Sequence, residues 1–326
     1  MDPFRETLPT ERPAVASPVV SVLVCTYQHG PWIAECLESI KAQRTDLPFE
    51  VLVGEDGSTD DTGAVCERVV AGDPRFHVYR WPPGPRWCIE GQPTGRRNFM
   101  RLYAMARGRY VHFIDGDDGW LDPLKLQRQV DLLERDPACM GSYHRTAVKD
   151  EAGALTHPWR EQLPDRMALE DVVATQAPFH PGSFLWRNTP AVRALITSEA
   201  GWKAGSGDMW FFASAATQGP LRAVEGELSF YRRHGQGLTA QGLFARTNIH
   251  RLRILQWQRL DRLTRGRWRA HLDAVCDRHL DQLAGVPMTA LDKRRWLLTL
   301  GRASRYFLDR RRWTRVLHAL RTAPAA

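Results

Sequence analysis

Residues 110–126 read YVHFIDGDDGWLDPLKL. The run from Tyr110 to Ile114 is mostly apolar, which is typical of a buried strand. It ends in Asp115-Gly116-Asp117-Asp118, and the following Asp122-Pro123 predicts the start of a helix, with the aspartate as cap and the proline in the first turn. The stretch therefore predicts a strand, a loop that carries carboxylates, and a helix.

Two earlier segments repeat this order of apolar strand and polar loop. Residues 19–25 (VVSVLVC) lead to Thr26-Tyr27, and residues 49–53 (FEVLV) lead to Gly54-Glu55-Asp56-Gly57. Apolar residues at helical spacing follow each, so strand and helix alternate, which favours a mostly parallel α/β sheet with helices on both faces. Because ligands bind beyond the carboxyl ends of the strands in such sheets, we expect the three polar loops to line one site.

Asp115 and Asp117 are the candidate metal ligands. Two carboxylates one residue apart at a strand end can share one divalent cation, or divide a metal and a ribose between them. Mg²⁺ and Mn²⁺ prefer such hard oxygen ligands and also accept phosphate oxygens. An Asp-Gly-Asp triplet also occurs in calcium loops and plain turns, but the EF-hand glutamate is missing, since Leu126 occupies its twelfth position.

The second polar loop has two interpretations. Glu55-Asp56-Gly57 is consistent with an Asp-Gly turn followed by a helix cap at Ser58 or Thr59. Alternatively, a carboxylate at this strand end can accept a hydrogen bond from the N3–H of a pyrimidine. Tyr27 could stack on the same base or simply lie at the rim of the site.

Together these segments resemble family 2 glycosyltransferases with the GT-A fold. The resemblance covers residues 19 to about 135, and its motifs occur in the expected order. They are the opening strand at 22–27, the acidic turn at 55–60, the Gly-Arg-Arg-Asn segment at 95–98, and the stretch at 114–126. The resemblance implies an inverting transfer of a sugar from a UDP- or dTDP-sugar donor, with Mn²⁺ or Mg²⁺ as cofactor.

Further roles are implied by the resemblance. Asp115 and Asp117 would hold the metal, with His234 of Tyr231-Arg232-Arg233-His234 completing its ligands, and Arg97 would lie near the donor's phosphates or sugar. The implied nucleotide-binding residues are Thr26, Tyr27, Glu55, Asp56, Arg97, Asn98, Asp115 and Gly116.

Asp208 is the candidate catalytic base. An inverting transfer needs a group that takes the proton of the acceptor hydroxyl. Gly207-Asp208-Met209-Trp210 is similar to the family's acidic motif at the head of a helix, although the family usually has Glu-Asp where this chain has Gly-Asp. A helix cap is the alternative for Asp208, and Asp171 is the reserve candidate for the base.

Pattern changes divide the chain into three parts. Residues 1–17 are polar and proline-rich and predict a flexible tail. Residues 18–240 form the expected GT-A domain, with a nucleotide-binding half at 18–135 and an acceptor-binding half at 136–240. Residues 241–326 predict a basic helical extension, which could be a cap packed on the domain, a surface that docks an anionic membrane, or an oligomerisation module.

Composition narrows the location and the partners. The chain has 326 residues, a net charge of +8 and six scattered cysteines, of which Cys25 and Cys36 lie in apolar patterns typical of buried thiols. No segment reaches the roughly 18 apolar residues of a membrane span, and the charged start lacks a signal-peptide core. We expect a cytoplasmic protein, located in the cytoplasm or at the inner face of the membrane.

Other functional classes fit less well. A nucleotidylyltransferase would have a glycine-rich, lysine-bearing loop after its first strand, where this chain has Thr26-Tyr27-Gln28-His29. A non-catalytic scaffold that only binds a nucleotide-sugar would not explain the presence of both Asp117 and Asp208. Nucleic-acid binding by the basic helices leaves the ordered carboxylates unexplained, so no nucleic-acid partner is expected. The expected acceptor is a glycan, a lipid-linked saccharide or a protein.

Overall fold

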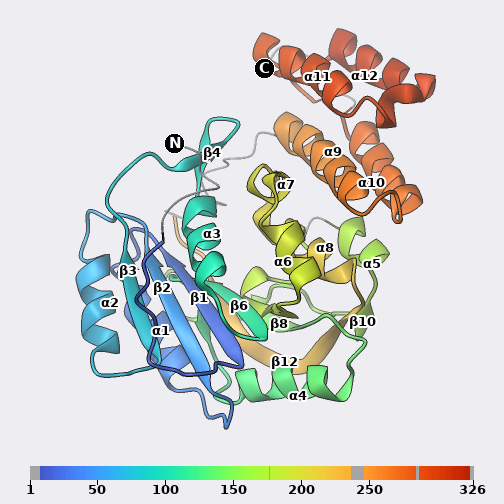
Figure 1. Ribbon diagram of the computed structural model, residues 1–326. Coiled ribbons are helices and arrows are strands. Elements are labelled where there is room, and N and C mark those ends of the chain that lie inside the picture. Colours follow the sequence, from blue (N-terminus) through green and yellow to red (C-terminus); the bar gives the residue numbers. More distant parts are fainter. Residues whose placement is uncertain (1–7, 176, 236–245, 284–285, 324–326) are drawn as a thin grey trace.

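The computed structural model describes residues 8–175, 177–235, 246–283 and 286–323. A twisted sheet carries helices on both faces, and a group of helices follows at the C-terminal end (Figure 1). The elements of the sheet domain are β1 (Val20–Thr26), α1 (Ile33–Lys41), β2 (Phe49–Glu55), α2 (Thr62–Val70), β3 (Phe76–Arg80), β4 (Trp87–Ile89), β5 (Gln92–Thr94), α3 (Arg96–Met105), β6 (Tyr110–Asp115), β7 (Gly119–Trp120), α4 (Lys125–Arg135), β8 (Gly141–Lys149), β9 (Leu155–Pro158), β10 (Arg166–Met167), α5 (Leu169–Ala174), η1 (Pro181–Ser183), β11 (Leu185–Arg187), α6 (Pro190–Ile196), α7 (Glu199–Trp202), α8 (Gly207–Ala216) and β12 (Leu221–Arg232). The C-terminal elements are α9 (Arg246–Leu263), α10 (Arg269–Asp281), α11 (Ala290–Arg302), η2 (Tyr306–Leu308) and α12 (Arg310–Thr322).

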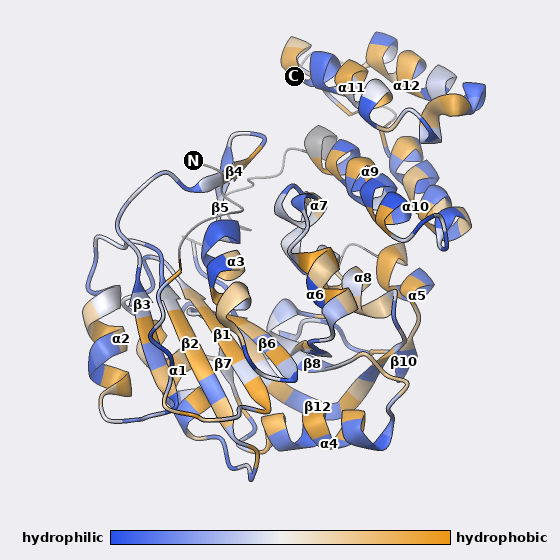
Figure 2. Ribbon diagram, in the orientation of Figure 1, coloured by the Kyte–Doolittle hydropathy of each residue, from blue (hydrophilic) through white to orange (hydrophobic). Residues whose placement is uncertain are grey.

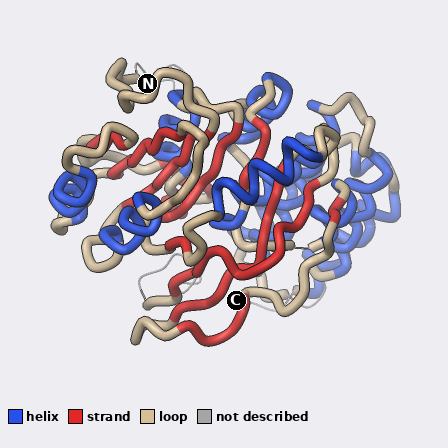
Figure 3. The backbone as a smooth tube through the Cα atoms, turned by 90° about the horizontal axis from the view of Figure 1, so that it is seen from below, coloured by secondary structure: helices blue, strands red, loops and turns tan. Residues whose placement is uncertain are grey.

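The strands form one continuous layer (Figure 3). Across the described residues the sheet runs β10-β12-β8-β11-β6-β1-β2-β3, with β7 paired to β12 and β9 to β8. Strands β3, β2, β1 and β6 are parallel, as the alternation of strands and helices predicts. Strand β11 is antiparallel to both β6 and β8, so the sheet is mixed beyond β6. The fold is a GT-A-type α/β fold.

The side chains of the central strands alternate between two cores. Val22 and Val24 face the core under α1, α2 and α4, whereas Leu23 and Cys25 face the core that α3 and α5 to α8 cover. This alternation follows from the period of two along a strand, and the central strands are correspondingly apolar (Figure 2). Cys25 and Cys36 are buried free thiols, as expected.

The predicted tail is attached to the domain over part of its length. The Glu11 carbonyl accepts a hydrogen bond from the Tyr79 hydroxyl at 2.8 Å, and the Ala14 N–H donates to the Pro74 carbonyl at 2.9 Å. These contacts join residues 11–14 to the segment around β3, and the flexibility predicted for residues 1–17 stays a prediction. Residues 1–7 lie outside the described residues.

The C-terminal helices are an extension of the main core. Leu252, Leu255 and Trp257 of α9 and Leu272 of α10 are buried in the same apolar cluster as α3 and α8. Helix α9 contacts α7, and α10 contacts α5. Within the part of the chain that the structure describes, none of the helices has the length and apolar character of a membrane span.

Candidate active site

Strand register brings the predicted loops to one edge of the sheet. Thr26 pairs with Glu55 on one side of β1, and Cys25 pairs with Asp115 on the other. Gly116 follows directly, and a Cβ atom there would lie 2.8 Å from the Cβ of Thr26. A glycine is therefore needed where the loop after β6 crosses the end of β1, and its backbone lies against Thr26.

Asp117 lies between two histidines. Its Oδ2 atom is 2.8 Å from Nε2 of His234 and 3.7 Å from Nε2 of His29. Burial opposes ionisation of Asp117, but the hydrogen bond from His234 and the nearby imidazole of His29 hold the pKa of this carboxyl below its usual value. The second ring nitrogens, Nδ1 of His234 and of His29, are buried and have no hydrogen-bond partner among the described residues.

Asp115 completes the acidic pair from the strand end itself. Burial, then the charges of Asp117 and Asp208, raise the pKa of the Asp115 carboxyl well above its usual value. Mutual repulsion of this kind shows that three carboxylates share one small region. The loop after β6 and the head of α8 are thus within electrostatic range of each other, although they are distant in the chain.

The side chains of this region would hold a metal ion only together with ligands from a bound substrate or water. Among the described residues, no group of three or more His, Cys, Asp and Glu side chains is arranged to hold a metal by itself. Asp115, Asp117 and His234 nevertheless offer hard oxygen and imidazole donors in one place, and Mg²⁺ is commonly held by one or two carboxylates plus substrate phosphates and water. The residues therefore fit a cation that a bound diphosphate would help to coordinate.

Asp208 lies in the first turn of α8 but does not cap it. The cap is Ser206, whose side chain accepts a hydrogen bond from the N–H of Met209 at 3.4 Å. Burial raises the pKa of Asp208, and the guanidinium groups of Arg96 and Arg253 oppose that rise. Ser206 is therefore the cap of α8, and the role of Asp208 as the base stays a prediction.

The reserve base candidate, Asp171, has a structural role. Its carboxylate accepts a hydrogen bond from the N–H of Ala168 at 2.9 Å, at the start of α5. It is exposed, and Asp208, not Asp171, shifts the pKa of Asp115.

The other end of the site gathers an aromatic ring, a carboxylate and arginines. The guanidinium of Arg86 lies 3.2 Å from the ring centroid of Tyr27. Burial raises the pKa of Asp56, whereas the charges of Arg86, Arg101 and Arg97 act against the rise. Arg97 is thus within electrostatic range of Asp56, and its predicted place near the donor's phosphates or sugar stays a prediction.

Two of the predicted nucleotide-binding residues have internal partners. The Glu55 carboxylate accepts a hydrogen bond from the N–H of Ser58 at 2.6 Å and shapes the turn at Gly57, where φ is +78°. The Asn98 side chain accepts from Nε1 of Trp81 at 2.9 Å and donates to the Gly54 carbonyl at 2.7 Å. Both side chains are buried. They hold the loops that form the site and have little surface left for a ligand.

Four residues of the site were not among the sequence candidates: His29, Arg86, Arg96 and Arg253. Arg96 lies beside the predicted Arg97, and its Nη2 atom donates to the Ala204 carbonyl at 3.2 Å, just before α8. Only the position of Arg96 in the Gly-Arg-Arg-Asn segment could have suggested it. Nothing local to Arg253 links it to Asp208, because the two lie on helices that meet only in the tertiary structure.

A cleft of about 330 Å³ adjoins the Asp117–His234 pair. It is lined by Trp32, Glu151, Arg232, His234 and Gly235. The rings of Trp32 and His234 lie 3.9 Å apart at their centroids. The Arg232 Nε atom donates to the Asp117 carbonyl at 3.0 Å, so the end of β12 forms one wall of the site.

Comparisons with known proteins agree with this geometry. The sequence profile of glycosyl transferase family 2 matches residues 21–195, which is more than half of the chain. An uncharacterized protein of Mycobacterium tuberculosis is 28% identical over 226 residues, a region covering 67% of this chain and 60% of the relative. The chain thus spans about 60% of the length of that relative.

Two solved structures share the fold. S. aureus TarS, residues 1–349 in complex with UDP-GlcNAc, superposes with a TM-score of 0.63 at 16% identity, covering 88% of this chain and 81% of TarS. The mannosyltransferase PcManGT of Pyrobaculum calidifontis, in complex with GDP-Man and Mn²⁺, superposes with a TM-score of 0.50 at 20% identity. The superposition covers 98% of this chain and 89% of PcManGT. The chain belongs to glycosyl transferase family 2 and has the GT-A fold.

Proposed function

We propose that the protein is a metal-dependent, inverting glycosyltransferase that uses a UDP- or dTDP-sugar. The observation that carries this proposal is the convergence of Asp115, Asp117 and His234 with Asp208 at the carboxyl end of β6. In-line displacement at an anomeric carbon requires a donor site and a base within one small region, on opposite sides of the reacting carbon. The donor class is also supported by the UDP-sugar in the TarS structure.

On this proposal Asp115, Asp117 and His234 hold Mn²⁺ or Mg²⁺ together with the donor's diphosphate. The bound ion would neutralise the charge that develops on the leaving nucleoside diphosphate. Arg232, whose Nε atom donates to the Asp117 carbonyl, fixes the backbone of the acidic loop. Nε2 of His29 lies 3.7 Å from Oδ2 of Asp117, and burial lowers the pKa of His29, which favours its neutral form.

The nucleoside end of the donor lies beside Tyr27 and Asp56. The Asp56 carboxylate can accept a hydrogen bond from the N3–H of uracil or thymine. The loop after β6 lies close to Thr26 at Gly116, and the ribose would lie beside this contact. Arg86 covers the Tyr27 ring, so a base that stacks on Tyr27 uses its other face or displaces Arg86. Asp208 accepts the proton of the acceptor hydroxyl as that oxygen attacks.

Activity at a membrane surface is a further part of the proposal. Large apolar side chains of the C-terminal elements are exposed, namely Leu291, Leu297, Leu298, Leu308 and Trp313. Exposed arginines accompany them: Arg294, Arg302, Arg310 and Arg311. Apolar and cationic groups together favour an anionic lipid surface, where a lipid-linked acceptor would be found. The protein should co-sediment with vesicles that contain phosphatidylglycerol, and equal binding of a Trp313→Ser, Leu308→Ser variant would contradict this.

A product assay tests the proposed reaction. The purified protein is incubated with Mn²⁺ and a panel of UDP-, dTDP- and GDP-sugars, and release of the nucleoside diphosphate is measured with saccharide and lipid-linked acceptors. We expect one uridine- or thymidine-based donor to react, with inversion at the anomeric carbon seen by NMR. Asp208→Asn should lower turnover by about 10²- to 10⁴-fold, whereas Asp171→Asn should not. Wild-type turnover by Asp208→Asn would refute the role of Asp208.

A further inference from the structure

Helix α9 of the C-terminal extension touches the turn that begins α8, the helix that carries Asp208. A Cβ atom at Gly205 would lie 2.6 Å from the Cβ of Leu252, so the turn approaches α9 closely enough to require a glycine. The next N–H, that of Ser206, donates to the side-chain oxygen of Gln256 at 3.0 Å. Because Ser206 caps α8, α9 fixes the residue from which α8 starts.

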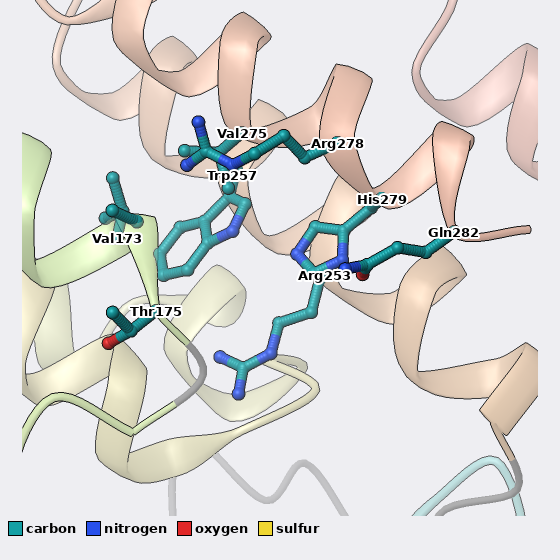
Figure 4. Close-up of a pocket in the computed structure, with 9 residues that line it drawn as sticks. Val173, Thr175, Arg253, Trp257, Val275, Arg278, His279 and Gln282 are labelled. Carbon is teal, nitrogen blue, oxygen red and sulfur yellow. The ribbon is translucent and has the colours of Figure 1, made fainter.

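Arg253 belongs to the same turns of α9 as Leu252 and Gln256. It is buried, with 5% of its surface exposed. Figure 4 shows its side chain extending from α9 in a different direction from the exposed Arg278 of α10. Its charge and that of Asp208 act on each other: burial lowers the pKa of Arg253 to about 10 although Asp208 acts to raise it, and Arg253 in turn favours the Asp208 carboxylate.

The opposite side of α9 is fixed as well. Glu90, at the tip of the β4–β5 hairpin, forms ion pairs with Arg251 of α9 at 2.8 Å and with Arg295 of α11 at 2.9 Å. Arg251 is itself fully buried. The helix is therefore held between the hairpin and the start of α8, which limits how far it can move.

We propose that helix α9 is an integral part of the site that activates the acceptor hydroxyl. Leu252 and Gln256 set the start of α8 and with it the direction of the Asp208 side chain, and Arg253, buried on the same turns of α9, is a positioning residue. The inference rests on the proposed role of Asp208 as the base. It gives the basic extension a role in catalysis in addition to any contact with a membrane.

The size of the effect follows from the geometry that proton transfer needs. A general base must come within about 3 Å of the proton it takes, and a misplacement of about 1 Å can cost about 10²-fold in rate. Leu252 and Gln256 contact the turn before α8, whereas Asp56, Asp115 and Asp117 lie at the ends of β2 and β6, so binding of the donor nucleotide should not change.

The test uses the full-length protein and compares variants within α9. Arg253→Met keeps the apolar stem and removes the charge, whereas Arg253→Lys restores a charge. Gln256→Met removes the bond to Ser206. Arg262→Met is the matched control, because Arg262 lies on the same helix and donates to the Arg302 carbonyl of α11 at 3.3 Å, away from the turn before α8. Melting temperatures and the Kd for UDP, dTDP and GDP with Mn²⁺ are measured alongside kcat and KM.

We expect Arg253→Met and Gln256→Met to lower kcat by about tenfold or more, with nucleotide Kd within about twofold of wild type. Arg253→Lys should recover a large part of the loss, and Arg262→Met should stay within about twofold. The inference is overturned if Arg253→Met and Gln256→Met lose no more than Arg262→Met, or if they weaken nucleotide binding as much as turnover. Full activity of Asp208→Asn would instead refute the proposed base, so the two failures are distinguishable.

Discussion

The Nε2 atom of His234 lies 2.8 Å from Oδ2 of Asp117, although 117 positions separate the two residues in the chain. The short strand β7 makes this contact possible, since Gly119 pairs with Phe230 and Trp120 with Ser229 of β12. This strand pairing holds the loop after β6 beside the end of β12, next to the contact between Asp117 and His234. A histidine beside a carboxylate in this way can bind a cation that neither group would hold alone.

Stacking at the nucleoside end gives the first prediction. Tyr27→Leu removes the aromatic face and should weaken binding of the preferred nucleotide by about 5- to 150-fold, since base–aromatic stacking is worth about 1–3 kcal/mol. Fluorescence or calorimetric titration measures the change. Phe in place of Tyr27 keeps the face and should bind within a fewfold of wild type. Equal affinity of Tyr27→Leu and wild type would mean that Tyr27 is only a rim residue.

Asn98 should behave as a structural residue. Asn98→Leu leaves the buried Trp81 N–H and the Gly54 carbonyl without partners, so the free energy of unfolding should fall by about 2–5 kcal/mol. Urea unfolding measures this loss. Its neighbour Arg97, which is less buried, provides the comparison: Arg97→Met should weaken nucleotide binding with little change in stability. The reverse pattern would contradict the roles given to the two residues.

A buried histidine pair predicts how stability depends on pH. His279 and His250 approach at 3.2 Å between their Nδ1 atoms, and burial, His250, Arg253 and Arg278 lower the pKa of His279 to about 3. In the unfolded chain this group titrates near about 6.5. Its contribution is fully present above that pH and is lost as pH falls, because only the unfolded chain takes up the proton.

His279→Gln should therefore flatten the pH dependence of stability. Between pH 7 and pH 5 the variant should lose about 2 kcal/mol less unfolding free energy than the wild type. Denaturant unfolding at the two pH values gives the slopes. His271 is exposed on the same helix, and His271→Gln should follow the wild type. Parallel curves for wild type and His279→Gln would show that His279 does not titrate as its burial requires.

Much of the fold follows from local sequence pattern. The apolar runs before Thr26, Gly54 and Asp115 are strands β1, β2 and β6, and their parallel pairing is as predicted. The helix after β7 starts at Lys125, later than the Asp122 cap predicts, and the Asp122 side chain accepts the N–H of Leu124 just before it. Parallel strands end at the same edge of the sheet, so the carboxylates at their ends lie close together. For this reason the sequence alone could assign these carboxylates to one site.

The rest of the site depends on contacts that no local pattern encodes. Arg253 comes within electrostatic range of Asp208 because α9 packs on the turn before α8, and the Gly205–Leu252 approach that allows this packing leaves no periodic signal. Asn98 was predicted to bind nucleotide because it belongs to a binding segment, yet its amide is used inside the fold. A motif indicates which residues lie near a site, whereas tertiary packing decides which of them face it.

Calorimetric titration of UDP, dTDP and GDP, with Mn²⁺ and with chelator, tests the central claim most directly. The wild type should bind one nucleotide in a Mn²⁺-dependent manner, Asp117→Ala should lose that dependence, and His234→Ala should weaken it by about tenfold or more. His318→Ala, at an exposed site on α12, should bind as the wild type does. Binding that is equal with metal and chelator, or unchanged in Asp117→Ala, would contradict a metal-assisted donor site at Asp115, Asp117 and His234.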